Sequence, residues 1–253
     1  MCKLPPGFKW SFSKLCAWDQ CPEMFRLCYI DRVKDDGNAF SDYGTFAHKL
    51  LERYAKGELP AFLLADAWES GYDDAVTHPF PPFPRGMPQK YFDAGAKYFA
   101  EFDGFGEEWE IVSAEERFEI NIGGYPFVGV LDLLLRSKKT GALWVVDHKS
   151  KSASSMEKSL ATYLRQLYTY AAYIKEKYGV YPQRLSFNMF REGTWIHEDF
   201  SQQAFDDTMR WIVETIENIL LDSGWKVCPS SYFCRFICSA LDACPEREAI
   251  LNS

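Results

Sequence analysis

The chain of 253 residues carries 28 basic and 36 acidic side chains, for a formal net charge of −8, and 47% of its residues are hydrophobic. That content suffices for a buried core in one large domain or two small ones, which excludes disorder for most of the chain. No apolar run approaches the roughly 20 residues that a membrane helix needs, and no secretory signal is recognisable near Met1. We therefore expect a cytoplasmic protein with no membrane partner. An acidic balance by itself also argues against nucleic acid as a partner.

The first part of the chain is predicted to be helical. In the opening segment, residues 10–31, Ser11 or Ser13 could cap a helix, and residues 35–38 (Asp-Asp-Gly-Asn) are typical of a loop. Apolar residues then recur at helical spacing in three stretches. These stretches are 43–56, 60–76 and 88–102.

The sequence pattern changes near residue 110, where short runs rich in β-branched and aromatic residues predict strands. The predicted strands are 111–122, 125–136, 142–149, 184–190 and 194–197. A long helix is expected at 156–178 and a last one at 202–221. Helices on both sides of a central mixed sheet give an α/β fold class.

Charged residues interrupt two of these strands. Asp132 lies within an otherwise apolar run, and the next strand ends in Asp147, His148 and Lys149. Alternation along a strand places Asp147 and Lys149 on one face and His148 on the other. If that face meets Asp132, two carboxylates converge and offer the oxygen ligands that Mg²⁺ or Mn²⁺ prefers. The alternative is structural: a buried Asp132–Lys149 ion pair, with Asp147 merely ending a strand.

Five short motifs follow one another along the chain. They are Gly44-x-x-x-His48, Glu115 or Glu116 in the first core strand, Gly129-x-x-Asp132, Asp147-x-Lys149 and Gln166-x-x-x-Tyr170. In this order they resemble the PD-(D/E)XK nuclease superfamily over residues 10–245. More narrowly, they are similar to the RecB-like exonuclease branch that includes the CRISPR-associated nuclease of spacer acquisition and phage recombination exonucleases. The resemblance implies a restriction-endonuclease-like core.

The same resemblance implies a divalent metal, Mg²⁺ or Mn²⁺. The implied ligands are His48, Asp132, Asp147 and the backbone carbonyl of His148, with Glu115 or Glu116 as an additional acid. For His48 taken alone, a partly buried helix histidine is an equally good interpretation.

Three further residues receive roles from the resemblance. Lys149 would activate the attacking water, Gln166 would support Lys149 or the scissile phosphate, and Tyr170 would contact the DNA backbone. Gln166 and Tyr170 lie one helical turn apart and share a face, although the polar edge of an amphipathic helix has the same spacing. The expected activity is hydrolysis of phosphodiester bonds by a metal-dependent deoxyribonuclease, an exonuclease rather than an endonuclease.

Eight cysteines fall in two groups at the ends of the chain. They are Cys2, Cys16, Cys21 and Cys28, and Cys228, Cys234, Cys238 and Cys244. Cytosolic thiols are kept reduced, so a metal is a better explanation than disulfides. The resemblance implies a [4Fe–4S] cluster on Cys21, Cys234, Cys238 and Cys244 that joins the two chain ends. Zinc is the alternative metal. The C-x3-C-x5-C spacing also leaves the choice between Cys228 and Cys234 open. Cys2, Cys16 and Cys28 are interpreted as small buried hydrophobes.

The charge is unevenly distributed. Between Asp132 and Gln166 lie seven basic and three acidic residues, a local net charge of +4. We therefore expect a basic groove on an acidic body, with Lys151, Lys158 and Arg165 as DNA contacts. The expected partner is DNA, as single strands or duplex ends, in recombination, repair or phage DNA processing, with a recombinase, a helicase or a single-strand-binding protein. An RNA nuclease and a catalytically idle DNA-binding scaffold with the same fold are the competing functions.

The domain organisation follows from these assignments. We expect a single nuclease domain over 1–253, with its core at about 40–200 and a helical insertion at about 58–105. The cysteine-cluster segments lie at about 10–30 and 225–246.

Overall fold

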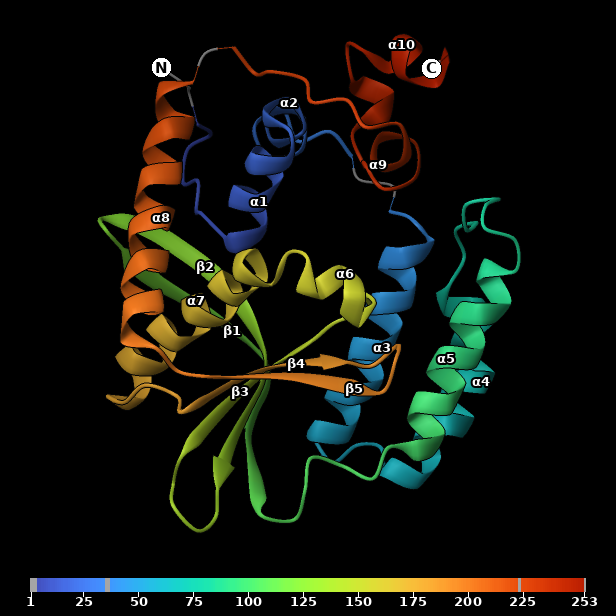
Figure 1. The fold of residues 1–253 in the computed structure, drawn as a ribbon, viewed down its shortest axis with the longest axis vertical. Helices are drawn as coiled ribbons and strands as arrows, with labels where there is room; N and C mark the ends of the chain where they lie inside the picture. The colour runs from blue at the N-terminus through green and yellow to red at the C-terminus, as the bar shows by residue number, and fades with distance from the viewer. Residues whose placement is uncertain (1–3, 35–36, 223, 253) are drawn as a thin grey trace. The chain divides into compact units, whose positions relative to one another are not determined.

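The computed structural model describes residues 4–34, 37–222 and 224–252 (Figure 1). The chain divides into two compact units. The first, here called the sheet unit, comprises residues 39–118 and 130–205. The second, the cysteine unit, comprises the N-terminal segment up to Asn38, residues 119–129 and the segment from Asp206 onward. Within the described residues, no helix is both long and apolar enough to cross a membrane.

A five-stranded mixed sheet forms the centre of the fold, with strand order β1-β2-β3-β4-β5. The strands are β1 (Trp109–Ile122), β2 (Tyr125–Ser137), β3 (Leu143–His148), β4 (Arg184–Met189) and β5 (Thr194–Asp199). Strand β3 is antiparallel to β2 and parallel to β4, and β4 is antiparallel to β5. The parallel β3–β4 pair requires a crossover, which the helix α7 (Leu160–Tyr178) supplies. The predicted α/β class with a central mixed sheet is confirmed.

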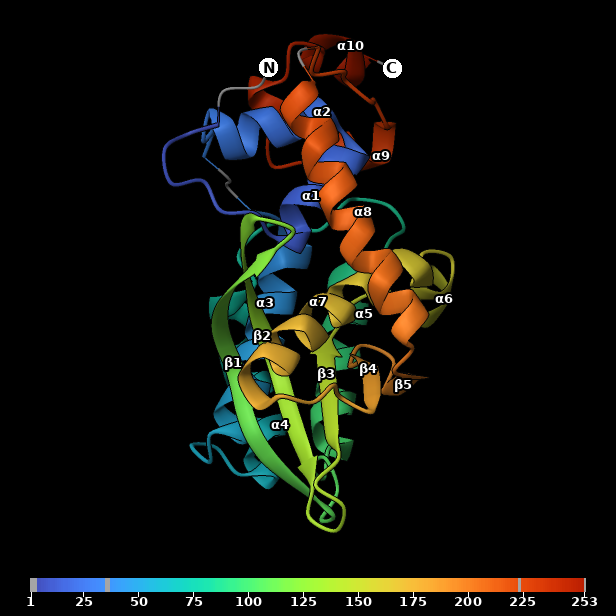
Figure 2. The same ribbon diagram turned by 90° about the vertical axis from the view of Figure 1, so that its left-hand side faces the viewer.

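Helices cover both faces of this sheet (Figures 1 and 2). On one face lie α3 (Ala39–Ala55), the short 3₁₀ turn η2 (Ala61–Leu63), α4 (Leu64–Ala75) and α5 (Met87–Glu101). The apolar sides of the three α-helices share a core with β2 and β3, in which Trp68 and Leu133 are buried. The helix α7 covers the other face. Alternate residues of β2 and β3 therefore point toward different helices.

The helix predicted at 156–178 is wrong in its first turn. A separate short helix, α6 (Ala153–Glu157), precedes α7, and Ser159 between them has φ −128° and ψ 17°, outside helical geometry. The hydroxyl of Ser152 caps α6 by accepting a hydrogen bond from the backbone N–H of Ser155. Serine favours such local bonds and turns over helix interiors, so the serine-rich stretch breaks the helical pattern.

The cysteine unit is built from both ends of the chain. It holds α1 (Phe12–Gln20), α2 (Pro22–Phe25), the π-helical turn η1 (Arg26–Ile30), most of α8 (Gln202–Leu221), α9 (Ser231–Phe236), the 3₁₀ turn η3 (Leu241–Ala243) and α10 (Arg247–Asn252). Ser11 caps α1, one of the two caps predicted. The ring of Phe25 stacks against Trp10 and Trp225, with centroids 6.3 and 6.1 Å away. Part of the loop predicted at 35–38 lies outside the described residues.

Candidate active site

Three side chains from three elements of the sheet unit converge where β2 and β3 meet α3. His48 from α3, Glu115 from β1 and Asp132 from β2 have ligand atoms within 4.8 Å of one another. Nδ1 of His48 lies 3.2 Å from Oε1 of Glu115 and 3.7 Å from Oδ2 of Asp132. Its Nε2 lies 3.0 Å from the backbone oxygen of His148. An imidazole, two carboxylates and a carbonyl form a donor set that fits Mg²⁺ or Mn²⁺.

The backbone of β1 selects which of two adjacent glutamates joins this group. Glu115 has φ +50°, a left-handed conformation rare for a residue with a side chain. Its carboxylate faces His48, whereas Glu116 accepts a hydrogen bond from the Tyr173 hydroxyl (2.6 Å) and pairs with Lys177. Such backbone strain costs about 1–3 kcal/mol and is concentrated at functional sites. Of the two acids proposed from sequence, the structure brings Glu115 to the site and not Glu116.

The two aspartates predicted to converge lie beside one another in the interior. Asp147 is fully buried, and Asp132 is 8% exposed. Oδ2 of Asp132 accepts a hydrogen bond from the backbone N–H of His148 at 2.8 Å. Burial and the neighbouring carboxylate of Asp147 raise the pKa of Asp132 to about 7. A cation at this position would relieve the repulsion between the two carboxylates.

A chain of polar contacts links Asp147 to helix α7. Nζ of Lys149 lies 2.7 Å from Oδ2 of Asp147 and donates a hydrogen bond to Oε1 of Gln166 at 2.9 Å. Gln166 donates to the Tyr170 hydroxyl (2.6 Å), which donates to Oδ1 of Asp147 (3.2 Å). The lysine is therefore paired with Asp147 rather than with Asp132. Tyr170, to which the resemblance gives a DNA contact, is 4% exposed and points toward Asp147.

The two histidines carry opposite electrostatic shifts. Burial by itself lowers the pKa of His48, but Asp132 and Glu115 outweigh it and raise that pKa to about 9. Both ring nitrogens of His48 then act as donors, toward Glu115 and toward the carbonyl of His148. Burial, together with His48 and Lys149, lowers the pKa of His148 well below its usual value, so this ring is neutral. The His148 ring contacts Asn188 and Phe105, whereas Asp147 contacts Lys149 and Tyr170, in agreement with the predicted alternation along the strand.

The three basic residues proposed as DNA contacts follow the site along the chain. Lys151, between β3 and α6, donates a hydrogen bond to the Tyr163 hydroxyl and sits over that ring, 4.5 Å from its centroid. Lys158 is exposed at the end of α6, and Arg165 is half-buried on α7. Their role in binding DNA stays a prediction.

Sequence reasoning missed Asn188 and Tyr98. Asn188 on β4 donates a hydrogen bond from Nδ2 to the Tyr98 hydroxyl at 2.7 Å, and the same nitrogen lies 3.0 Å from Nδ1 of His148. One signal was present in the sequence: a lone asparagine in the buried strand at 184–190, because an uncompensated buried amide is costly.

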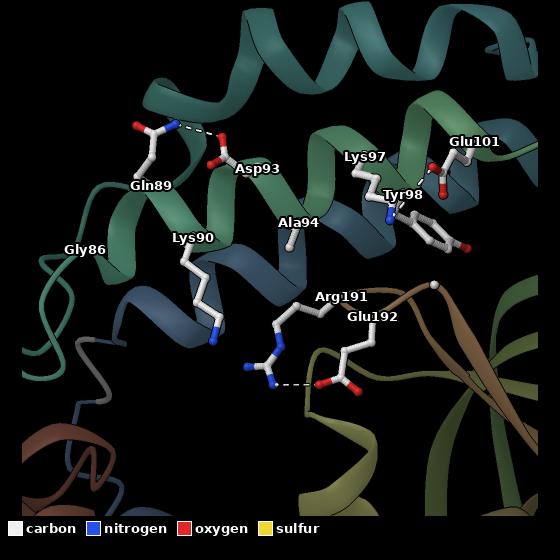
Figure 3. Close-up of a pocket in the computed structure, with 11 residues that line it drawn as sticks. Gly86, Gln89, Lys90, Asp93, Ala94, Lys97, Tyr98, Glu101, Arg191 and Glu192 are labelled. Atoms are coloured by element: carbon white, nitrogen blue, oxygen red, sulfur yellow. Dashed lines mark hydrogen bonds and ion pairs between the residues drawn. The ribbon is translucent and has the colours of Figure 1, made fainter.

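A pocket of about 650 Å³ lies between α5 and the β4–β5 turn (Figure 3). Its lining mixes charges, with Lys90, Lys97 and Arg191 beside an equal number of acids. Arg191 donates to the Tyr91 hydroxyl at 2.6 Å, and Glu192 accepts from the backbone N–H of Ala153 at 2.8 Å. Tyr98 lines this pocket and also contacts Asn188, so one wall of the pocket is hydrogen-bonded to the network behind the site.

Four cysteines line one small cavity in the cysteine unit, and they are Cys21, Cys234, Cys238 and Cys244. This is the set that the resemblance implies. Burial and the neighbouring cysteines Cys234 and Cys28 raise the pKa of the Cys238 thiol to about 11. Cys228 donates its backbone N–H to the sulfur of Cys21 at 3.4 Å and is not among the lining residues. Four thiols around one cavity fit either iron or zinc.

Two buried acids on adjacent strands, with a lysine and a histidine beside them, are the groups that metal-assisted hydrolysis requires. The comparisons with known proteins agree. The family model of the PD-(D/E)XK nuclease superfamily matches residues 9–245, and the chain belongs to this superfamily. No curated protein matches the sequence.

Solved structures resemble the chain at low sequence identity. One is the crystal structure of a "putative exonuclease" from Eubacterium rectale, with a TM-score of 0.49 and 10% identity over 87% of this chain and 84% of that one. Another is the crystal structure of SSO0001, with a TM-score of 0.34 and 16% identity over 89% of this chain and 93% of that one.

Proposed function

We propose that this nuclease is a DNA exonuclease of the RecB-like branch that depends on Mg²⁺ or Mn²⁺. The observation that carries the proposal is the convergence of His48, Glu115 and Asp132 beside the buried Asp147–Lys149 pair. Each of the five motifs contributes at least one side chain to the sheet unit, which supports the proposal; these residues are His48, Glu115, Asp132, Asp147, Lys149, Gln166 and Tyr170. The exonuclease assignment and the choice of DNA over RNA rest on the resemblance.

The residues of the site would have different roles in the reaction. His48, Glu115, Asp132 and Asp147, with the carbonyl of His148, would hold the ion, which lowers the pKa of a bound water and neutralises charge on the phosphate. Lys149 would orient the attacking water or stabilise charge on the phosphate oxygens. Gln166 and Tyr170 are positioning residues: Gln166 accepts a hydrogen bond from Lys149, and Tyr170 ties Gln166 to Asp147.

The protein is incubated with Mn²⁺ and end-labelled single-stranded DNA. RNA of the same sequence is tested in parallel as a second substrate. We expect degradation by the unaltered protein and a loss of at least about 1,000-fold on Asp147→Ala, because catalysis depends on the bound metal. Lys177→Ala is the matched control, since this lysine pairs with Glu116 away from the site, and its activity should be retained. No degradation, or equal degradation by Asp147→Ala, would favour the idle DNA-binding scaffold.

Circular single strands decide between the two modes of cleavage. An exonuclease needs an end, so we expect linear DNA to be degraded and circular DNA of the same sequence to survive. Cleavage of the circle would establish an endonuclease. This activity would serve recombination, repair or phage DNA processing, with a recombinase, a helicase or a single-strand-binding protein as partner.

We further propose that Cys21, Cys234, Cys238 and Cys244 hold a [4Fe–4S] cluster. The shared cavity of these four residues supports the proposal, and the resemblance favours iron over zinc. Protein purified without oxygen should be brown and absorb near roughly 400 nm, and Cys234→Ser should lose that band while Cys228→Ser keeps it. A colourless protein with one zinc per chain would contradict the assignment.

A further inference from the structure

The strand β4 pairs with β3, which carries proposed metal ligands, and its residue Asn188 belongs to a buried network of hydrogen bonds. Asn188 pairs in register with His148 on the parallel strand β3, and its backbone oxygen accepts the N–H of Lys149 at 2.8 Å. The Asn188 side chain is fully buried. This single residue therefore contacts both of the residues that follow Asp147.

The amide of Asn188 divides its two N–H groups between two partners. One hydrogen goes to the Tyr98 hydroxyl on α5 (2.7 Å), and the other points to Nδ1 of His148 (3.0 Å). Because the amide nitrogen of Asn188 can only donate, Nδ1 of His148 is the acceptor, and a neutral ring bound in this way carries its proton on Nε2. Tyr98 holds the amide in place from the opposite side, and the plane of the His148 ring is thereby fixed.

The same arrangement has a cost. Oδ1 of Asn188 is buried and has no hydrogen-bond partner among the described residues. An unsatisfied buried acceptor destabilises the folded state, and an apolar side chain of similar shape would avoid that cost. Stability alone is therefore a poor explanation for an asparagine at this position. A fixed orientation of His148 beside the proposed metal site is a better one.

His148 connects the network to the metal ligands. Its ring contacts Asn188, its N–H binds Asp132 (2.8 Å), and its carbonyl oxygen lies 3.0 Å from His48. We propose that Asn188, held by Tyr98, is a positioning residue that locks the His148 peptide so that its carbonyl faces His48 and the metal site. Partners behind a ligand commonly contribute ten- to a hundred-fold to metal affinity or activity. This inference rests on the proposed metal-dependent nuclease.

The experiment measures Mn²⁺ affinity directly, by calorimetry on the full chain without DNA, for Asn188→Leu and Tyr98→Phe. Ser186→Ala is the matched control, because Ser186 lies two residues earlier on β4 and is equally buried. Its hydroxyl likewise joins two partners, Nε1 of Trp144 (2.7 Å) and Nδ1 of His197 (2.8 Å), neither of which is a proposed ligand. If Asn188 had a structural role alone, Asn188→Leu would change the thermal stability and leave the Mn²⁺ affinity unchanged, as expected for Ser186→Ala.

We expect Mn²⁺ to bind Asn188→Leu about 10- to 100-fold more weakly, Tyr98→Phe more weakly to a smaller extent, and Ser186→Ala as tightly as the unaltered protein. Unchanged Mn²⁺ affinity in Tyr98→Phe and a folded Asn188→Leu would overturn the inference. If Asn188→Leu does not fold, Tyr98→Phe decides alone, because loss of one hydroxyl leaves the apolar contacts of the ring in place. Failure of the unaltered protein to bind Mn²⁺ would instead refute the proposed function.

Discussion

At the scale of single residues, the site combines two carboxylates that repel each other with two positively charged groups beside them. Two carboxylates, Asp132 and Asp147, lie together in the interior, and His48 and Lys149 supply the positive charge next to them. The raised pKa values of Asp132 and His48 both mean that the folded chain without metal binds protons more tightly than the unfolded chain. Protons and the metal ion therefore compete for the same oxygen and nitrogen atoms.

The sign of the pH dependence follows from those two groups. The stability that His48 contributes is complete below its unfolded pKa and is lost as pH rises through about 9. Protonated Asp132 likewise stabilises the folded state less as pH rises from about 4 through about 7. The metal needs both groups deprotonated, so we expect the increase in Tm caused by Mn²⁺ to be larger at pH 8.5 than at pH 6, in roughly physiological salt.

Thermal unfolding with and without Mn²⁺ at both pH values measures this effect. Asp132→Asn should reduce the increase in Tm at either pH, because it removes one proposed ligand. An increase in Tm that is equal at the two pH values, or larger at pH 6, would show that these groups do not bind the ion.

At the scale of elements, close approach between helices decides where glycine is required. Gly95 on α5 lies against Trp68 on α4, and a Cβ at Gly95 would lie 2.1 Å from the indole. Trp68 is fully buried and donates a hydrogen bond to the backbone oxygen of Phe92, so its ring has no room to move. Gly44 on α3 has no such neighbour, since a Cβ there would meet only the Ser150 hydroxyl at an ordinary 3.7 Å.

Gly95 and Gly44 should consequently respond differently to replacement by alanine. Gly95→Ala should lower the free energy of unfolding by about 1–3 kcal/mol, because overfilling a core forces side chains and backbone to shift. Gly44→Ala should leave it unchanged or raise it by up to about 1 kcal/mol, the helix propensity gained. Urea unfolding of both variants measures the two values, and equal effects would contradict the steric explanation.

At the scale of the whole molecule, the proposed functions are divided between the two units. Every proposed ligand of the divalent metal belongs to the sheet unit, and the four cysteines around the small cavity belong to the cysteine unit. The cysteine unit relies on short helices contributed by both chain ends. A ligand that ties such segments together stabilises them by coupling its binding to their folding.

Loss of the proposed cluster should therefore have a local effect. In Cys21→Ser we expect faster amide hydrogen exchange in α1, α2 and α9, with protection in β3 and β4 retained, because local unfolding reports local stability. Cys16→Ser is the matched control, since Cys16 lies on α1 and is not among the residues lining the cavity. Uniform loss of protection across both units would contradict this division.

Local patterns in the sequence predicted the five strands and the fold class, and they proposed a set of candidate site residues. Hydrophobic alternation and helical periodicity are local patterns, so all five strands and the helix at 202–221 could be read directly. The spacing of Asp147 and Lys149 placed them on one face for the same reason. Family motifs then pointed to His48, Gln166 and Tyr170.

Which of these groups meet depends on contacts between distant parts of the chain. The choice of Glu115 over Glu116 depends on a left-handed backbone angle within β1, which no residue pattern encodes. The pairing of Lys149 with Asp147 depends on side-chain rotamers, which neighbouring residues determine. Asn188 and Tyr98, which contact each other, lie 90 residues apart in the sequence. Long-range contacts of this kind arise from strand register and helix docking, which are settled only when the whole core is assembled.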